Sequence, residues 1–278
     1  MNKQGALGNI LDRIIEYKKL EVERRREKLS VSALKDSARY HGKRHDFCRA
    51  LENSPDFGII AEFKRKSPSQ NDINLSADAA VVGRAYVEAG AAAISCLTDT
   101  QFFGAQPDDI DKLRAVVDVP VLRKDFIIDS YQLHETRAMG ADAVLLIASV
   151  LTPVQIDELA EEANELGLQV VCEVHDEEEV AKISPSVDII GVNNRNLGDF
   201  SVNISRSLQL ADMLPPGMLR ISESGIDDPQ SIVKLRKARY RGFLVGTHFM
   251  RQSDPGESLA AFIRKAHEIE DIYKDAIA

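Results

Sequence analysis

The sequence predicts a (β/α)8 barrel, and three observations lead to this expectation. From about residue 57 onward, short runs rich in β-branched residues alternate with longer segments of helical periodicity. These runs begin apolar and end in polar residues, and glycines separate several helices from the strands that follow them. Eight βα units of this kind fit a barrel whose functional residues lie where the strands end. An open, doubly wound parallel sheet is the competing architecture.

The strand candidates have the length and the apolar character of buried parallel strands. In chain order they cover residues 57–64, 92–99, 120–126, 141–148, 168–176, 187–195, 218–225 and 241–249. Helices are expected near residues 77–89, 108–117, 129–139, 153–166, 176–183, 203–214, 229–238 and 257–273. Gly90, Gly140 and Gly167 each stand between a helix and a strand, where a left-handed C-cap is expected.

Residues 1–45 are expected to form a helical extension, followed by the barrel at residues 46–278. The extension carries 12 Lys and Arg against 6 Asp and Glu, whereas the rest of the chain is acidic. Its interleaved acidic residues and its lack of a long apolar core argue against a transit or signal peptide. Helical spacing of its apolar positions predicts an amphipathic helix packed on the barrel. These positions are Leu7, Leu11, Ile14, Ile15, the stem of Lys18, Val22 and Leu29.

Composition excludes several classes of function. The longest apolar run, at residues 143–151, is far shorter than the roughly 18 residues of a membrane-spanning helix. An acidic barrel without a basic stripe argues against nucleic acid as a partner. Cys48, Cys96 and Cys172 are too widely spaced for a disulfide framework or a zinc cluster. We therefore expect a cytoplasmic protein that binds neither membrane nor nucleic acid.

Charged residues end the first and third expected strands. The two-residue period of a strand places Glu62 and Lys64 on one face, and unpaired charges are costly inside a barrel. Lys124 lies between Leu122 and Phe126 on the equivalent face of the third strand. Burial is expected to lower the pKa of Lys124, although pairing with Glu62 or Glu173 would hold its charge. Both lysines are candidates for acid–base chemistry.

Later strands add a base and an anion site. Glu173 follows an apolar run and is the best candidate for a general base. Asn193 and Arg195 end the sixth strand, and Glu223 ends the seventh. Glycines follow strands seven and eight, as Gly225 and Gly246, where barrels of this kind bind phosphate, and Lys64 and Arg195 supply cations. The sequence lacks GxGxxG and GxxxxGK[ST] motifs, so we expect acid–base chemistry on a phosphorylated substrate without metal or cofactor.

The segment IAEFKRKSPS at residues 60–69 resembles the first-strand signature of the indole-3-glycerol phosphate synthase family. Other segments resemble that family in order and spacing, including VLRKDF at 121–126, EVHD at 173–176, GVNNRNL at 191–197 and SESGI at 222–226. The resemblance implies a cofactor-free lyase of tryptophan biosynthesis. Such a lyase closes the indole ring of 1-(2-carboxyphenylamino)-1-deoxyribulose 5-phosphate and releases carbon dioxide and water.

The resemblance also implies a role for each site residue. Lys124 would protonate the ribulose carbonyl during ring closure, and Lys64 would pair with the substrate carboxylate and serve as an acid in the later dehydration. Glu173, held by Asn193, would be the base of that dehydration. The remaining implied site residues are Glu62 and Glu223 in the polar mouth, Arg195, Gly225, Gly246, Thr247 and Lys64 at the phosphate, Ser67 and Ser224 in the pocket wall, and Phe63 and Phe126 at the aryl ring.

Three segments depart from the family pattern. Asn71 stands where a loop glycine is usual, and we expect it to adopt a left-handed conformation. Ala105-Gln106 replaces a common Gly-Ser, and residues 239–242 replace a Gly-Ala pair before the eighth strand. Two other functions stay open, namely an isomerase of a neighbouring phosphosugar pathway and a catalytically silent phosphosugar-binding relative. Association with other enzymes of tryptophan biosynthesis is a further open expectation.

Overall fold

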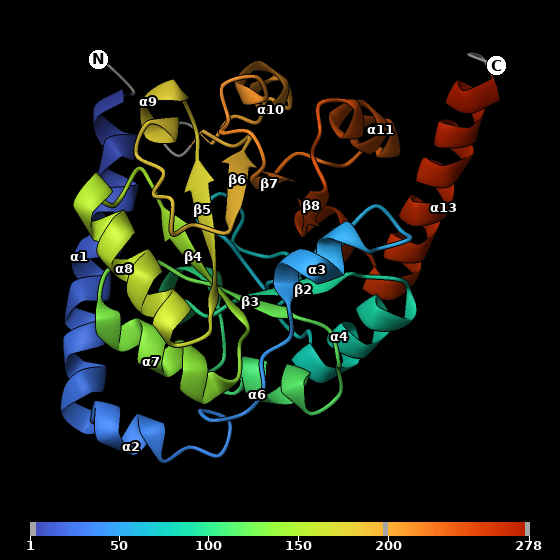
Figure 1. Cartoon of the computed structure of the whole chain (residues 1–278). Helices are drawn as coiled ribbons and strands as arrows, with labels where there is room; N and C mark the ends of the chain where they lie inside the picture. The colour runs from blue at the N-terminus through green and yellow to red at the C-terminus, as the bar shows by residue number, and fades with distance from the viewer. Residues whose placement is uncertain (1–3, 197–199, 276–278) are drawn as a thin grey trace.

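Eight parallel strands close into a barrel in the computed structural model, which describes residues 4–196 and 200–275. The strands follow chain order, and β8 pairs with β1 (Figure 1). They are β1 Ile59–Phe63, β2 Ala93–Leu97, β3 Val121–Lys124, β4 Ala143–Ile147, β5 Gln169–Val174, β6 Ile189–Asn193, β7 Leu219–Glu223 and β8 Gly242–Val245. The predicted barrel is confirmed, and the open doubly wound sheet is excluded. Leu197, the last residue of the sixth-strand motif, lies outside the described residues.

Each of the eight predicted helices is present. They are α4 Ala79–Glu88, α6 Asp109–Arg114, α7 Ser130–Met139, α8 Pro153–Glu165, α9 Glu177–Val180, α10 Ser205–Leu210, α11 Pro229–Lys237 and α13 Pro255–Asp275. The short helices α3 Phe47–Glu52, α5 Thr100–Phe103 and α12 Thr247–Met250 were not predicted, because their residues fall outside the segments assigned to helices. The eighth strand was predicted too long, since α12 begins at Thr247.

Helix ends follow the expected capping chemistry. Gly140 ends α7 with a φ of +89°, a left-handed C-cap as predicted. Arg239 occupies the corresponding place after α11 and adopts a φ of +70°, although the family usually has glycine near there. A side chain in this conformation costs about 1 kcal/mol, so this departure weakens the bottom of the barrel slightly.

Side chains inside the barrel form their own core. Ile60, Leu122 and Val171 project inward, while the alternate residues of each strand pack against the surrounding helices. Helix α3 closes the bottom, where Phe47 and Leu51 join this inner core. Burying one such side chain stabilises the fold by about 2–3 kcal/mol. With the bottom closed, the open end is the one formed by the carboxyl ends of the strands.

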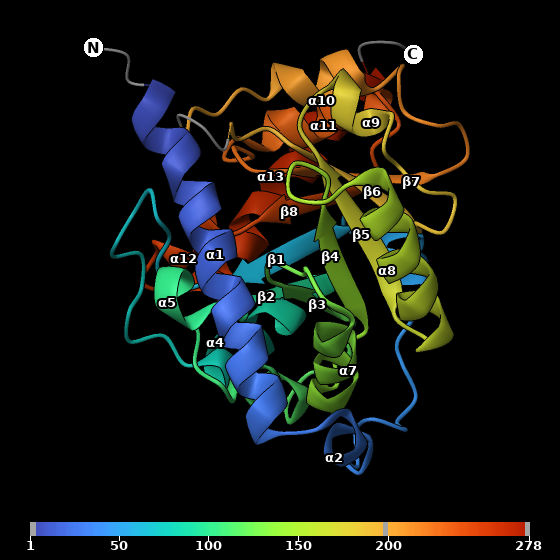
Figure 2. The ribbon, with the colours of Figure 1, turned by 90° about the vertical axis from the view of Figure 1, so that its left-hand side faces the viewer.

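The N-terminal helix α1 (Gln4–Lys28) crosses the barrel in front of the strands and leads into α2 (Val31–Lys35) (Figure 2). Ile14 and Val22 are buried as predicted, whereas Leu29 is 45% exposed because it lies beyond the end of α1. Lys18 is buried to its ammonium group, which lies 2.8 Å from carboxylate oxygens of both Asp99 and Asp125. The expectation that only its stem packs was therefore wrong. No helix within residues 4–196 and 200–275 has the length and apolar character to cross a bilayer.

Candidate active site

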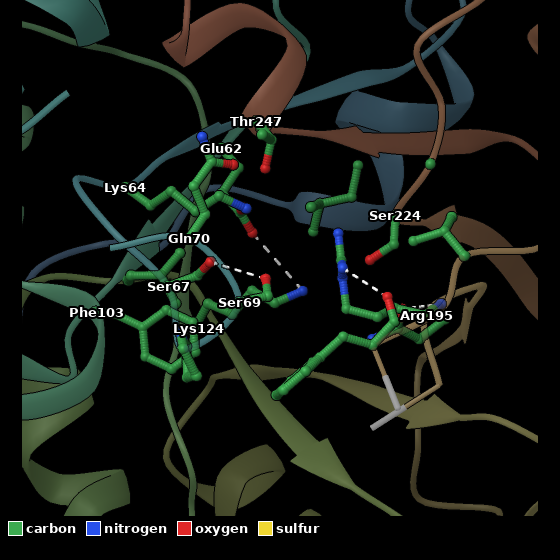
Figure 3. A pocket seen from close by; sticks show the side chains of 18 of the residues that line it. Glu62, Lys64, Ser67, Ser69, Gln70, Phe103, Lys124, Arg195, Ser224 and Thr247 are labelled. Atoms are coloured by element: carbon green, nitrogen blue, oxygen red, sulfur yellow. Dashed lines mark hydrogen bonds and ion pairs between the residues drawn. The ribbon is translucent and has the colours of Figure 1, made fainter. Parts of the chain in front are cut away.

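A cavity of about 860 Å³ opens at the carboxyl ends of the strands, within the size range of small-molecule sites. Apolar side chains of Ile10, Leu11 and Ile14 from α1 contribute to its wall. Phe103 and Arg195 lie on opposite sides of the space in Figure 3, with Lys124 near Phe103 and Ser224 near Arg195. The cavity thus has cationic side chains on both sides, with apolar side chains of α1 and Phe103 among them (Figure 3).

Twelve of the fourteen predicted site residues line this cavity. They are Glu62, Lys64, Ser67, Lys124, Phe126, Glu173, Asn193, Arg195, Ser224, Gly225, Gly246 and Thr247. The residues come from β1, β3, β5, β6, β7 and β8 or from the segments that follow these strands. The two exceptions are Phe63 and Glu223.

Phe63 was wrongly assigned to the aryl-binding wall. Its side chain is buried in the layer between strands and helices, where the guanidinium carbon of Arg65 lies 4.8 Å from the ring centroid. The reason is the alternation of β1, because Glu62 faces inward and the next residue must then face outward. Phe126 does line the cavity, and the ring of Phe103 is tilted against it with 6.2 Å between ring centroids.

Lys124 lies among three carboxylates. Its Nζ pairs closely with Glu223 Oε2 and lies 3.7 Å from Glu173 Oε2 and 3.8 Å from Glu62 Oε2. Burial alone would lower the pKa of Lys124, but the charges of Glu223, Glu173 and Glu62 outweigh burial and raise it. The expected depression was therefore wrong, and pairing holds the lysine as a cation. The ammonium group is therefore protonated before the reaction begins, as it must be to donate a proton to a reacting oxygen.

Glu223 lies beneath the cavity, fully buried against Lys124. Burial raises its pKa to about 7, Lys124 opposes this rise, and the nearby Glu173 carboxylate adds to it. A Cβ atom on Gly191 of β6 would lie 2.2 Å from Glu223 Oε1, so glycine at this position leaves the space that the carboxylate occupies. Glu223 does not line the cavity, but it contacts Lys124, which does.

Glu62 and Lys64 pair on β1 and its continuation, with Oε1 and Nζ 2.5 Å apart. Burial would raise the pKa of Glu62, but the charges of Lys64 and Lys124 outweigh it and lower the pKa. Gly246 lies directly behind this carboxylate, because a Cβ there would approach Glu62 Oε1 to 2.3 Å. The two lysines and three glutamates therefore form one interleaved charge cluster.

Asn193 does not hold Glu173, contrary to expectation. Its Oδ1 accepts the backbone N–H of Arg195 at 2.9 Å, and no hydrogen bond joins the two side chains, both of which are described. Strand register explains this, because Glu173 lies beside Gly191 and Asn193 lies further toward the mouth. The partners of Glu173 are Lys124 at Oε2 and His175 Nε2, which lies 3.4 Å from Oε1.

The predicted phosphate site surrounds the ends of β7 and β8. Ser224 and Gly225 both have positive φ, at +67° and +72°, and a Cβ on Gly225 would collide with Val202 at 2.1 Å. Thr247 begins α12 beside Gly246. Arg195 follows β6 on the same side of the cavity as Ser224 (Figure 3), and its guanidinium donates to the carbonyl of Phe200 at 3.1 Å. Backbone N–H groups and one arginine can thus converge on an anion here.

A sequence model described as indole-3-glycerol phosphate synthase matches residues 11–262 of this chain. The chain belongs to the indole-3-glycerol phosphate synthase family. The indole-3-glycerol phosphate synthase of Bacteroides thetaiotaomicron is 46% identical over 256 residues, covering 92% of this chain and 98% of the relative. That of Salinibacter ruber is 43% identical over 254 residues, covering 91% and 94%.

Solved structures support the fold alone. A tryptophan synthase α2β2 complex structure from Pyrococcus furiosus includes a chain that aligns with a TM-score of 0.58 at 15% identity, covering 77% of this chain and 98% of that one. Tryptophan synthase subunit alpha from Legionella pneumophila aligns with a TM-score of 0.56 at 14% identity, covering 81% and 98%.

The loop after β1 is where this member of the indole-3-glycerol phosphate synthase family departs most from the pattern. Asn71 does not have a positive φ, so the expected left-handed conformation was wrong. Ser67 and Gln70 instead exchange two backbone hydrogen bonds, of 2.8 and 2.9 Å, which tighten the turn before Asn71. Gln70 Oε1 accepts from Arg251 beside α12, so the loop is tied across the mouth. At the second departure, the Gln106 N–H donates to Asp109 at 2.7 Å.

We did not predict from the sequence that His175 belongs to the site. It lies two residues after Glu173, on the same face of the chain as it leaves β5, and the two-residue period could have indicated this contact. The contact of His175 with Glu179 could not be predicted, because Glu179 comes from the following helix.

Proposed function

We propose that this chain closes the indole ring of 1-(2-carboxyphenylamino)-1-deoxyribulose 5-phosphate to form indole-3-glycerol phosphate, acting as a carboxy-lyase in cytoplasmic tryptophan biosynthesis. The observation that carries the proposal is Lys124, held as a cation by three glutamates in a cavity that is lined by both apolar and cationic side chains. Family membership supports the same reaction. Association with other enzymes of the pathway stays a prediction.

The aryl ring and the phosphate of the substrate would bind to different parts of the cavity. The aryl ring would pack on Phe126 and Phe103. The phosphate would lie on Arg195 and the backbone around Gly225 and Gly246, with Lys64, Thr247, Ser67 and Ser224 nearby. Lys64 would also pair with the aryl carboxylate. This arrangement would place the ribulose carbonyl above Lys124.

Ring closure would begin when the aromatic carbon that carries the carboxylate attacks the ribulose carbonyl. Lys124 Nζ would donate its proton to the carbonyl oxygen as the carbon–carbon bond forms. The bond to the carboxylate would then break, and its electron pair would restore the ring electrons as carbon dioxide leaves. The product of this step keeps a hydroxyl group on the new ring.

Dehydration would complete the indole. Lys64 would protonate the departing hydroxyl, and Glu173 would remove the proton whose loss creates the final double bond. Glu223 would keep Lys124 charged, and Glu62 would hold Lys64 in position, since each carboxylate lies against its lysine. A silent phosphosugar-binding relative would have no use for two acids paired in this way.

The reaction can be tested directly by mixing the protein with the substrate in the presence of a chelator and following indole fluorescence. The chain contains no Trp, so its own background is low. We expect a fluorescence rise that matches carbon dioxide release in equal amounts. Tight substrate binding without either signal would contradict the proposed function and favour a silent relative.

A further inference from the structure

His175 forms the middle of a chain of three side chains behind the base candidate Glu173. Its Nε2 lies 3.4 Å from Glu173 Oε1, and its Nδ1 lies 3.0 Å from Glu179 Oε2. The side chain of His175 is only 10% exposed. The imidazole therefore separates Glu173, which faces the cavity, from a second carboxylate that does not line it.

Glu179 is itself fixed in place. Its backbone N–H donates to the side chain of Asp176, the N-cap of α9, at 2.9 Å. Its Oε2 also accepts the backbone N–H of His175 at 2.7 Å. The same oxygen lies 3.0 Å from Nδ1, so Nδ1 carries a proton and donates to Glu179. The other ring nitrogen, Nε2, then faces Glu173.

His175 Nε2 is buried without a hydrogen bond among the described residues, and Glu173 Oε1 is close enough to become its partner after a small rotation. A buried ring nitrogen without a partner is costly, which favours that rotation. Glu173 then has a different partner at each oxygen, with His175 at Oε1 and Lys124 near Oε2.

We propose that His175 is a positioning residue for Glu173, donating from Nε2 to Oε1 so that the carboxylate turns Oε2 toward Lys124 and the substrate. This inference rests on the proposed function, in which Glu173 is the base of the dehydration.

The charges around His175 agree with a donor at both nitrogens. Burial would lower the pKa of His175, but the hydrogen bond that it donates to Glu179 and the charges of Glu173 and Glu179 outweigh burial and raise it. Arg206 of α10 opposes them. Glu173 on β5, Glu179 on α9 and Arg206 on α10 are the charged groups that face the ring.

Two substitutions separate positioning from simple structural support. In His175→Gln the amide nitrogen can reach the place of Nε2, whereas in His175→Asn it can reach only the place of Nδ1. We expect His175→Asn to lower kcat by about tenfold or more with KM within about twofold, as for a misplaced catalytic group. The acid limb of its kcat–pH profile should move to higher pH, because Glu173 loses a cationic neighbour. His175→Gln should keep most of kcat, because its amide can still donate to Oε1, although its acid limb should move in the same direction, since an amide carries no charge.

A second readout does not depend on turnover. The ring of His175 can be followed by NMR titration in the full chain, with the His175→Gln variant used to assign its signal. We expect Glu173→Gln to lower the pKa of His175, because an opposite charge is removed. An unchanged titration would overturn the inference even if the protein showed no turnover.

The two proposals fail in different ways. A wild-type protein without turnover would remove the proposed function, while the titration would still decide whether His175 and Glu173 are paired. A wild-type protein with turnover whose His175→Asn variant matches it in kcat and pH profile would overturn only the positioning role. Equal losses in the Asn and Gln variants, tracking a fall in melting temperature, would also overturn it.

Discussion

Lys18 and Asp125 form an ion pair of 2.8 Å in which both side chains are fully buried. Lys18 belongs to α1, which contributes Ile10 and Leu11 to the cavity wall, and Asp125 directly follows Lys124. A second carboxylate, of Asp99 after β2, lies at the same distance from the ammonium group. One buried lysine therefore ties the covering helix to the strand end that carries the proposed acid.

Lys18→Met should be strongly destabilising, because it removes the ammonium group that bridges the buried carboxylates of Asp99 and Asp125. We expect a loss of about 3–5 kcal/mol in the free energy of unfolding, measured by urea denaturation. Lys265→Met, in an exposed pair on α13, is the matched control and should change stability by less than about 0.5 kcal/mol. Equal stability of the two variants would contradict the account of the ion pair.

The same variant should also change the pH dependence of stability. Burial would raise the pKa of Asp125, but Lys18 and Arg123 outweigh it and lower the pKa. Its stabilising contribution is therefore present above the usual Asp pKa and is lost only as pH falls through the lowered value. Removing Lys18 should raise the pKa of Asp125, so acid unfolding should begin at higher pH in Lys18→Met than in the wild-type protein.

Glu223→Gln should move the basic limb of the kcat–pH profile to lower pH. Glu223 is the carboxylate that does most to raise the pKa of Lys124 against the effect of burial. Without this charge Lys124 would lose its proton more readily, and an acid must be protonated to act. Glu268→Gln, on the exposed side of α13, should leave the profile unchanged. If the basic limb stays in place in Glu223→Gln, then the loss of activity at high pH does not come from deprotonation of Lys124.

Gly191→Ala should reduce catalysis, and Gly83→Ala should reduce stability. A methyl group at Gly191 would push Glu223 away from Lys124, so we expect kcat to fall about tenfold or more. At Gly83 the equivalent contact, 2.3 Å to Leu113 Cδ2, lies in the outer core. That variant should lose about 1–3 kcal/mol of stability with kcat within about twofold. Steady-state kinetics and thermal melting of both variants test this. Normal kcat in a folded Gly191→Ala protein would contradict the role given to the space beside Glu223.

Phe126→Leu and Phe63→Leu should separate binding from folding. Phe126 lines the cavity, so the smaller side chain should raise KM several-fold by removing contact with the aryl ring, roughly 1 kcal/mol of apolar contact. Phe63 is buried in the outer core, so its variant should unfold more easily while KM stays the same. A raised KM in the folded Phe63→Leu protein would restore Phe63 to the site.

Patterns along single strands could be predicted from the sequence, because period two alone places Glu62 with Lys64 and Leu122 with Lys124. The partners of these residues could not. The register of separate strands brings Lys124 to Glu223 and keeps Asn193 apart from Glu173. This register depends on how the whole barrel closes. Lys18 shows the same limit, since its fully buried partners Asp99 and Asp125 lie far away along the chain.

The central claim is that Lys124 is the acid of ring closure. The most direct measurement is the single-turnover rate of indole formation by Lys124→Ala, compared with Lys234→Ala on the exposed side of α11. We expect Lys124→Ala to react at least about 100-fold more slowly while it still binds substrate, and Lys234→Ala to match the wild-type rate. A folded Lys124→Ala protein that forms indole at the wild-type rate would contradict the account.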